Sequence, residues 1–355
     1  MKINKYRVGP YINMIEKELI KSGFEGDEID YIFECWSEPH RHYHDKMHLF
    51  ELVAKIDRYS GLSEEDRNDL FVVACFHDIV YNPKMINEKV DDRYGLLNTG
   101  WNEVQSIMKF SEMAESKPEH FDSERIIRII DAISATGRRE TPIEKIACLF
   151  WILDNEILSE SFDVLLRYER EIEQEFQFAS WPQYKKARVS FLRSEAERLE
   201  SEDLRRLADF VENRRPSVAI YPGSFNPFHK GHLDILKKAE RVFDKVIIVK
   251  GVNPDKSEST TPLPQYLQYH EIIEWDGLTT DLIKDIEAHS EVTLLRGLRN
   301  GKDLDYEVNQ IRFMEEMYPR LNVVFFQCSK DLEHVSSSAI RKIQTFSEKE
   351  ANKYL

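Results

Sequence analysis

The chain has 355 residues, of which 41% are hydrophobic and 32% are charged, and its formal net charge at pH 7 is −15. This length allows two domains that each bury a core of their own. The acidic balance argues against a protein that coats nucleic acid, and no apolar run in the sequence reaches the length of a membrane span.

Residues Met1–Arg7 lack the apolar core of a secretion signal. The four cysteines (Cys35, Cys75, Cys148 and Cys328) are scattered, without a Cys-x-x-Cys pair. This pattern predicts free thiols in a reducing compartment, so we expect a cytoplasmic protein.

Residues up to about 213 are predicted to be helical. Segments 124–133 and 162–172 carry apolar residues at intervals of three and four, which is typical of amphipathic helices. Polar or proline-bearing breaks fall at 60–63, 81–83, 117–119 and 138–142. We therefore expect an all-α domain over residues 1–213.

Histidines and aspartates concentrate at three places in this helical region. His44 and His48 are four residues apart and would share a face if their segment is helical. His77 and Asp78 end an apolar helix, and Asp154 ends another apolar run. Imidazole and carboxylate groups from separate helices suit a divalent transition metal such as Mn, Fe, Co, Ni or Zn. A carboxylate in apolar surroundings also needs a compensating charge, which a metal would supply.

The order His, His-Asp, Asp resembles the HD superfamily of metal-dependent phosphohydrolases over about residues 28–200. The pattern is most similar to a branch of predicted phosphohydrolases with four short motifs. These read Arg-x-Tyr-His-x-x-x-His-Leu, Phe-His-Asp-x-x-Tyr, Asn-Glu and Leu-Asp-x-(Asp/Glu), and here they occupy 41–49, 76–81, 87–88 and 153–156. The resemblance implies an HD-type helical domain whose metal ligands are His48, His77, Asp78 and Asp154.

The same resemblance implies two supporting residues. His44 would be a fifth ligand, a phosphate binder or a general acid, and Glu88 would support the ligands or orient water. The chain departs from the branch at Lys89–Asp92, where a small polar residue is usual, and at Asn155 or Glu156, where aspartate is frequent. Three hypotheses stay open: an active phosphohydrolase, a metal-binding regulatory module that does not hydrolyse, and a helical domain whose histidines only cap or bridge helices.

Beyond Arg215–Pro216 the pattern changes. Short β-branched runs alternate with helical segments, which predicts an α/β fold with a parallel sheet. The runs are 218–221, 246–249, 292–295 and 323–326. We place the boundary within 212–217, so that the second domain comprises residues 217–355.

The loop after the first of these strands reads Tyr-Pro-Gly-Ser-Phe-Asn-Pro-Phe-His-Lys-Gly-His over residues 221–232 and leads into an amphipathic helix. Gly223 and Gly231 let the backbone approach a ligand closely, and the helix N-terminus directs free N–H groups at an anion. His229 and His232 add donors that can stabilise charge on a reacting phosphate. The segment therefore predicts a phosphate site.

This loop resembles the nucleotidyltransferase superfamily that carries a (His/Thr)-x-Gly-His signature, and within it the phosphopantetheine adenylyltransferase family. The resemblance runs from about Ser217 to Ile343. It rests on four motifs in family order, at 221–225, 253–256, 295–299 with 305–307, and 335–341. It implies a Rossmann-like domain that transfers the adenylyl group of ATP to 4′-phosphopantetheine, giving dephospho-coenzyme A and pyrophosphate.

The resemblance also implies residue roles. His232 would donate to the α-phosphate, His229 would contact the β- or γ-phosphate, and Lys256 would bind phosphate. Nucleotide or substrate binding is implied for Gly223, Ser224, Phe225, Arg296, Gly297, Arg299, Glu307, Ser336, Ser337 and Ser338. Mg²⁺ would bridge phosphate oxygens of ATP. Taken alone, the two arginines are also consistent with surface ion pairs, and the serines with a helix N-cap.

The acceptor is less constrained than the nucleotide. Between Lys256 and Gly277 the chain is shorter than the family and lacks its Thr-x-x-Glu-Arg helix start, whereas Asp276–Leu282 resembles the next acceptor loop. Phosphopantetheine is therefore the first hypothesis, and nicotinamide mononucleotide or a phospho-alcohol that takes CMP are the alternatives. We further expect a homo-oligomer that acts on small molecules and binds neither nucleic acid nor membrane.

Overall fold

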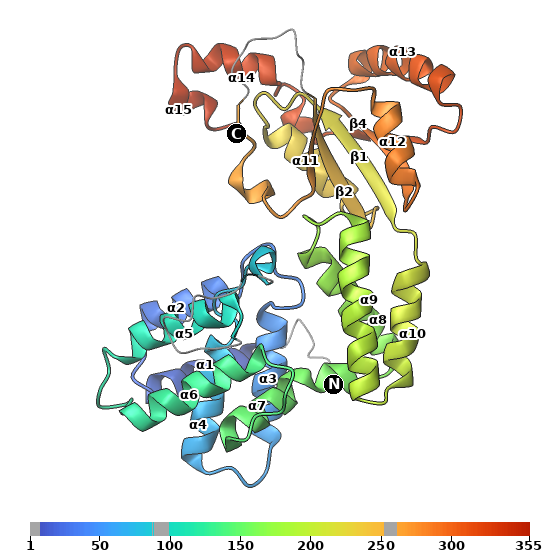
Figure 1. Cartoon of the computed structure of the whole chain (residues 1–355). Coiled ribbons are helices and arrows are strands. Elements are labelled where there is room, and N and C mark those ends of the chain that lie inside the picture. Colours follow the sequence, from blue (N-terminus) through green and yellow to red (C-terminus); the bar gives the residue numbers. More distant parts are fainter. Residues whose placement is uncertain (1–7, 87, 89–98, 252–260) are drawn as a thin grey trace. The chain divides into compact units, whose positions relative to one another are not determined.

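The computed structural model describes residues 8–86, 88, 99–251 and 261–355 (Figure 1). The chain forms two compact units. Unit 1 comprises the residues up to 175 together with 193–207, and unit 2 comprises 176–192 together with 208–355. The predicted domains, 1–213 and 217–355, are continuous ranges, whereas each unit is made of two stretches of chain. The predicted ranges therefore stay predictions.

Unit 1 is built from helices. Their bounds are α1 (Gly9–Lys21), α2 (Gly26–Cys35), α3 (Lys46–Arg58), α4 (Glu64–Phe76), α5 (Trp101–Ala114), α6 (Ser123–Thr136), α7 (Lys145–Asn155) and α8 (Phe162–Glu175), with short 3-10 turns at Pro83–Met85 and Glu156–Ser159. Two more helices, α9 (Trp181–Arg198) and α10 (Glu202–Asn213), contribute residues to both units. The N-terminal region is thus helical, as the sequence predicts.

The apolar stripes of these helices meet in one core. Its fully buried aromatic side chains include Trp36, Phe76, Phe110 and Phe150. Helix α4 lies at the centre, and residues 70–76 of this helix are all buried. Burial of this helix on all sides explains why its sequence reads as a continuous apolar run rather than as an amphipathic stripe.

Unit 2 contains a parallel five-stranded sheet in the order β3-β2-β1-β4-β5. The strands are β1 (Ser217–Gly223), β2 (Lys245–Gly251), β3 (Ile272–Trp275), β4 (Glu291–Leu298) and β5 (Val323–Gln327). The helices that follow β1, β3 and β4 are α11 (Lys230–Ala239), α12 (Thr279–Glu287) and α13 (Gly301–Met317), and the chain ends with α14 (Ser337–Gln344) and α15 (Glu348–Ala351). This arrangement confirms the predicted parallel sheet and fits a Rossmann-like nucleotidyltransferase.

Alternate residues of the strands feed two separate cores. On one face, Ala219 and Tyr221 of β1 pack with Ile235 and Leu236 of α11. On the other face, neighbouring β1 residues pack with α12, which contributes Leu282 and Ile283. Figure 1 shows α11 and α12 on opposite sides of the sheet. Because both faces are covered, the strands are apolar on both sides, which made four of them visible in the sequence.

Strand β3 is the exception, since the sequence did not indicate it. It has four residues, lies at an edge of the sheet and alternates between exposed and half-buried positions. Such a short edge strand carries little hydrophobic signal. No helix in the described part of the chain is both long and apolar enough to cross a membrane.

A buried lysine of the unit 2 sheet forms hydrogen bonds with the segment that precedes α9. Lys245, the first residue of β2, is 5% exposed. Its ammonium group donates to the backbone oxygens of Gln177 and Ala179, the latter at 2.8 Å, and lies 3.0 Å from a carboxylate oxygen of Glu271. Residues 177–179 therefore belong structurally with strands that come about seventy residues later in the chain.

Candidate functional site

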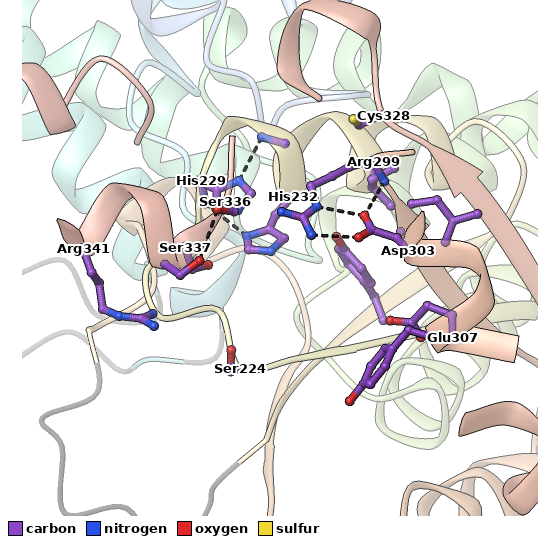
Figure 2. A pocket seen from close by; sticks show the side chains of 17 residues that line it. Ser224, His229, His232, Arg299, Asp303, Glu307, Cys328, Ser336, Ser337 and Arg341 are labelled. Atoms are coloured by element: carbon purple, nitrogen blue, oxygen red, sulfur yellow. Dashed lines mark hydrogen bonds and ion pairs between the residues drawn. The ribbon is translucent and has the colours of Figure 1, made fainter. Parts of the chain in front are cut away.

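A cavity of about 570 Å³ opens in unit 2 where β1 and β4 end (Figure 2). Most of its lining residues come from the loop after β1, the end of β4, and the first turns of α11, α13 and α14. They are Tyr221, Ser224, His229, Gly231, His232, Ile235, Gly297, Leu298, Arg299, Asp303, Tyr306, Glu307, Cys328, Ser336, Ser337, Ser338 and Arg341. In an open parallel sheet this position, where the strand order reverses, is where ligands bind.

The two histidines of the loop are fixed by the start of α11. His229 is the N-cap residue, and its Nδ1 accepts the backbone N–H of Gly231 at 3.1 Å. His232 accepts the backbone N–H of His229 on Nδ1 at 3.3 Å, and the two rings stack with centroids 3.7 Å apart. Since Nδ1 of each ring is an acceptor, the proton of each neutral ring lies on Nε2.

These rings are neutral at physiological pH. Burial and the neighbouring Arg299 guanidinium lower the pKa of His229 to about 4. Burial, His229 and Arg299 lower the pKa of His232 to about 3. The site thus offers uncharged N–H donors to an anion, next to the positive end of a helix.

The glycines of the loop have steric reasons to be glycine. A Cβ on Gly223 would lie 2.8 Å from the ring of Phe225, which is itself 1% exposed and has a φ of 46°. A Cβ on Gly231 would lie 3.0 Å from the ring of His229. Both positions keep the loop tight against the helix N-terminus. Phe225 does not line the cavity; it packs on His232 with ring centroids 5.0 Å apart and so supports it.

Arg296, in β4, and Arg299, directly after that strand, are ion-paired with acids from α13. Arg299 forms two bonds with Asp303, at 2.8 Å each, and Arg296 pairs with Glu307. Both pairs are partly buried, and Arg299, Asp303 and Glu307 line the cavity. The ion pairs that the sequence allowed for these arginines are therefore present, with Glu307 as the partner of Arg296 and Asp303 as the partner of Arg299.

A second helix N-terminus faces the same cavity. The Ser336 hydroxyl accepts the N–H of Ala339 at 3.2 Å and so caps α14, and the Ser337 hydroxyl donates to Pro227 O at 3.0 Å. Ser338 lines the cavity and its hydroxyl lies 3.3 Å from that of Ser336. The serines thus form a helix cap and part of the cavity wall at once. Lys256 lies outside the described residues.

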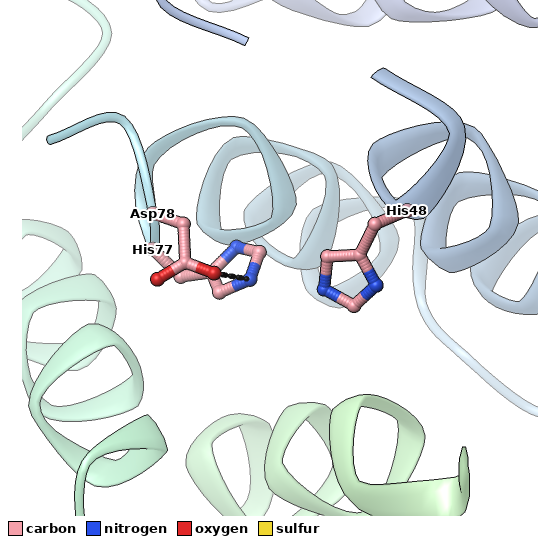
Figure 3. Close-up of side chains that lie close together, drawn as sticks. All are labelled: His48, His77 and Asp78. Carbon is pink, nitrogen blue, oxygen red and sulfur yellow. Dashed lines mark ion pairs between the residues drawn. The ribbon is translucent and has the colours of Figure 1, made fainter. Parts of the chain in front are cut away.

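The predicted metal ligands of unit 1 also come together. His77 Nε2 lies 3.1 Å from Asp78 Oδ2, and Asp154 Oδ1 lies 3.1 Å from His48 Nε2 and 3.8 Å from His77 Nε2. Figure 3 shows His48 opposite the His77–Asp78 pair, and one nitrogen of each ring faces the space between them. The four predicted ligands from α3, the end of α4 and α7 therefore share one cluster.

The chemistry of these donors fits a divalent cation. The Nε2 atoms of His48 and His77 are buried, and although each lies 3.1 Å from a carboxylate oxygen, neither makes a well-aligned hydrogen bond among the described residues. Nδ1 of His77 lies 3.0 Å from Ala74 O, which holds a proton on Nδ1, so Nε2 is the nitrogen that gives up its proton and offers a lone pair when a cation binds. Burial lowers the pKa of His77, but Asp78 and Asp154 outweigh it and raise the pKa to about 9. The cluster therefore attracts positive charge.

The other two predicted residues of unit 1 differ. His44 does not share the helix of His48, because α3 begins at Lys46 behind its N-cap Asp45. Its ring nevertheless lies near that of His48, with centroids 5.9 Å apart. Glu88 is exposed, and in the described part of the chain no contact joins it to the four-residue cluster.

The sequence missed several residues of the two sites. Arg341 and Tyr306 line the cavity of unit 2, and each lies inside a motif that had been singled out for its neighbours. In unit 1, the buried Arg41 donates to the backbone oxygens of Asp78 and Ile79, at 2.7 and 3.1 Å. Glu175 bonds to the His44 ring, and no pattern in α8 distinguished it from the other glutamates of that helix.

Comparisons with known proteins concern unit 2. A family model described as cytidylyltransferase-like matches residues 220–343. Phosphopantetheine adenylyltransferases from Mycoplasma mycoides and Mycoplasma capricolum are 36% and 37% identical over 139 residues, which is 36% of this chain and 97% of each relative. The enzyme of the same name from Clostridium botulinum is 33% identical over 138 residues, which is 36% of this chain and 85% of the relative.

Proposed function

The chain belongs, through its C-terminal region, to the phosphopantetheine adenylyltransferase family, and we propose that it transfers the adenylyl group of ATP to 4′-phosphopantetheine. The products are dephospho-coenzyme A and pyrophosphate, so that the reaction is a step of coenzyme A biosynthesis. The observation that carries the proposal is the pair of neutral Nε2–H donors of His229 and His232 in a cavity that also receives the N-terminus of α14.

The reaction needs positioning and charge stabilisation more than a covalent intermediate. An oxygen of the acceptor phosphate attacks the α-phosphorus, and pyrophosphate leaves on the opposite side. The Nε2–H of His232 donates to the α-phosphate as negative charge develops there, and His229 donates to the β- or γ-phosphate. Both donors are fixed before substrate arrives, because the backbone N–H groups of Gly231 and His229 orient the rings.

The remaining predicted residues bind the rest of ATP. Ser336, Ser337 and Ser338 offer hydroxyl and backbone donors to the triphosphate at the start of α14. Arg299 turns from Asp303 toward phosphate oxygens, and Glu307 holds Arg296 or binds ribose. Ser224 and Gly297 line the cavity, Gly223 leaves room for the Phe225 ring behind it, and Lys256 supplies a further cation. Mg²⁺ enters with ATP as part of the substrate.

The test measures pyrophosphate release by the full-length chain with ATP, Mg²⁺ and a panel of acceptors. We expect release with 4′-phosphopantetheine and none with nicotinamide mononucleotide. CTP with a phospho-alcohol covers the second alternative. A preference for either alternative acceptor would replace phosphopantetheine while keeping nucleotidyl transfer.

The cluster in unit 1 supports a second function, metal-dependent phosphate ester hydrolysis. The specific observation is the pair of buried, unbonded Nε2 atoms of His48 and His77 beside the carboxylates of Asp78 and Asp154. These four side chains would hold a divalent transition metal, which when bound activates water and polarises phosphate. The alternative is a metal-binding regulatory module that does not hydrolyse.

A phosphatase assay on the full-length chain separates these two. The purified protein is stripped with a chelator, reloaded in turn with Mn, Fe, Co, Ni and Zn, and given p-nitrophenyl phosphate. We expect phosphate release with at least one metal and its loss in His77→Ala. Stoichiometric metal without any release would favour the regulatory module.

Three further expectations complete the proposal. The four cysteines are free, which agrees with a reducing, cytoplasmic setting. Small phosphorylated molecules are the partners, as expected for both sites. Self-association of the chain, and the absence of nucleic-acid or membrane partners, stay predictions.

A further inference from the structure

His44 lies outside any helix, yet its ring is fixed beside the cluster of predicted metal ligands. Its Nδ1 is 2.7 Å from Glu175 Oε2, and its ring stacks on Tyr81 with centroids 4.4 Å apart. Nε2, on the other edge of the ring, has no protein partner within the described residues, and the side chain is 22% exposed. One edge of the imidazole is therefore anchored and the other is available.

Glu175 is the anchor. It is the last residue of α8, and its side chain is 0% exposed. Oε1 accepts the backbone N–H groups of three consecutive residues, His42, Tyr43 and His44, at 2.8 Å each. Oε2 accepts the Tyr81 hydroxyl at 2.6 Å in addition to the His44 ring.

Every partner of this carboxylate is a donor, which identifies it as an ionised acceptor. A buried carboxylate without such partners would be very costly, so five converging donors point to a built feature. Burial alone raises the pKa of Glu175, but His44 and the bonds from Tyr81 and the backbone outweigh it and lower the pKa to about 2. The loop 42–44 is thus wrapped around one charged group.

Arg41 fixes the same loop from its other side. Its guanidinium donates to the backbone oxygen of His44 at 3.3 Å and to that of Asp78 at 2.7 Å. The residue that precedes the loop therefore ties His44 to the turn that carries a predicted metal ligand. With the loop held on both sides, the His44 ring has one orientation relative to the cluster.

We propose that Glu175 is the positioning residue of this site: it fixes His44 so that Nε2 contacts a phosphate group of the substrate at the metal cluster. The proposal rests on the hydrolytic function proposed above. Among the roles that the sequence left open for His44, the proposal assigns it direct contact with the substrate phosphate. The carboxylate of Glu175 acts through the imidazole and does not itself touch substrate.

The test compares four full-length proteins loaded with Mn²⁺: wild type, Glu175→Gln, His44→Gln and the double variant. Asp163→Asn, an exposed carboxylate on the same helix, is the matched control. With p-nitrophenyl phosphate we expect Glu175→Gln to lower kcat about 10- to 100-fold, with metal content unchanged. The double variant should be no worse than His44→Gln, because the two residues act as one unit.

A second readout does not depend on turnover. Calorimetric titration with inorganic phosphate should show about tenfold weaker binding in Glu175→Gln and in His44→Gln, and unchanged binding in Asp163→Asn. Tyr81→Phe removes a single donor and should give a smaller loss in the same direction. This variant carries the test if Glu175→Gln does not fold.

Three results would overturn the proposal: wild-type kcat and phosphate affinity in Glu175→Gln, losses that multiply in the double variant, or wild-type phosphate affinity in His44→Gln. The failure of the hydrolytic function is distinguishable. In that case the wild type releases no phosphate with any metal, and the phosphate titration alone decides the role of Glu175.

Discussion

The two sites use the same side chain in opposite electrostatic settings. In unit 2, His229 and His232 lie beside an arginine and at a helix N-terminus, and their pKa values fall to about 4 and about 3. In unit 1, His77 lies between two aspartates, and its pKa rises to about 9. One site is arranged to receive an anion and the other to receive a cation.

The difference shows that a histidine alone does not determine which ligand a site binds. The groups that surround the ring determine it. Backbone N–H groups occupy Nδ1 of the unit 2 histidines, so Nε2 donates. A backbone oxygen accepts from Nδ1 of His77, so Nε2 is the nitrogen that can exchange its proton for a cation. The neighbour of Nδ1 therefore decides whether the other nitrogen binds phosphate or metal.

The largest expected effect concerns the anion site. His232→Ala should lower pyrophosphate release about 100- to 1,000-fold, because it removes a preorganised donor to the transition state. The measurement is kcat with saturating ATP and acceptor. The control His289→Ala changes an exposed histidine in the same unit and should behave as wild type. A decrease of less than threefold in His232→Ala would contradict the comparison.

The predicted cation site of unit 1 should make the stability of the chain depend on a divalent metal. Adding Mn²⁺ at about 100 times its Kd should stabilise the full-length chain by about 2.7 kcal/mol, since the ion binds only the folded state. Thermal unfolding with and without a chelator measures this effect. The shift should vanish in His77→Ala and persist in His232→Ala. The reverse pattern would mean that Mn²⁺ binds unit 2 and would contradict the prediction.

The acid dependence of stability should follow the unit 2 histidines. Their pKa values in the folded state lie below the unfolded value of about 6.5, so the unfolded state binds more protons and stability falls as pH drops below 6.5. Between pH 7 and pH 5 each of the two rings should contribute a loss on the order of 2 kcal/mol, measured by denaturant unfolding. His232→Gln should reduce this slope, and an unchanged slope would argue that the rings are not buried as neutral groups.

The smallest effect separates a helix cap from a phosphate ligand. Ser336→Ala and Ser347→Ala each remove an N-cap, on α14 and α15, and each should cost about 1 kcal/mol of stability. Only Ser336 lines the cavity, so only Ser336→Ala should also raise KM for ATP, by a few-fold. Equal KM values in the two variants would mean that Ser336 is only a cap.

The sequence predicted the features whose residues are close together in the chain. The apolar runs of β1, β2, β4 and β5 and the loop at 221–232 are visible because each is a continuous segment. The order of His48, His77, Asp78 and Asp154 predicted a cluster that the structure forms. The family resemblance of the C-terminal region is confirmed, whereas the HD-type fold of the N-terminal region stays a prediction.

What the sequence did not predict depends on contacts across long separations. Glu175 lies 131 residues after His44, in a helix with many glutamates, and only the tertiary fold makes it a buried anchor. Strand β3 forms because it pairs with β2, not because its own four residues favour a strand. The partner of Arg296 was also set by the turn between β4 and α13, which brings Glu307 to it.

The lysine that begins β2 limits how this chain can be divided. Lys245 takes its oxygen partners from residues 177 and 179, far upstream of the first strand. A gene fragment that starts at residue 217 would leave a buried ammonium group without these acceptors, at a cost of about 1–3 kcal/mol for each lost partner. A cut at residue 217 would thus remove a segment, 176–192, that belongs to the same compact unit as the sheet.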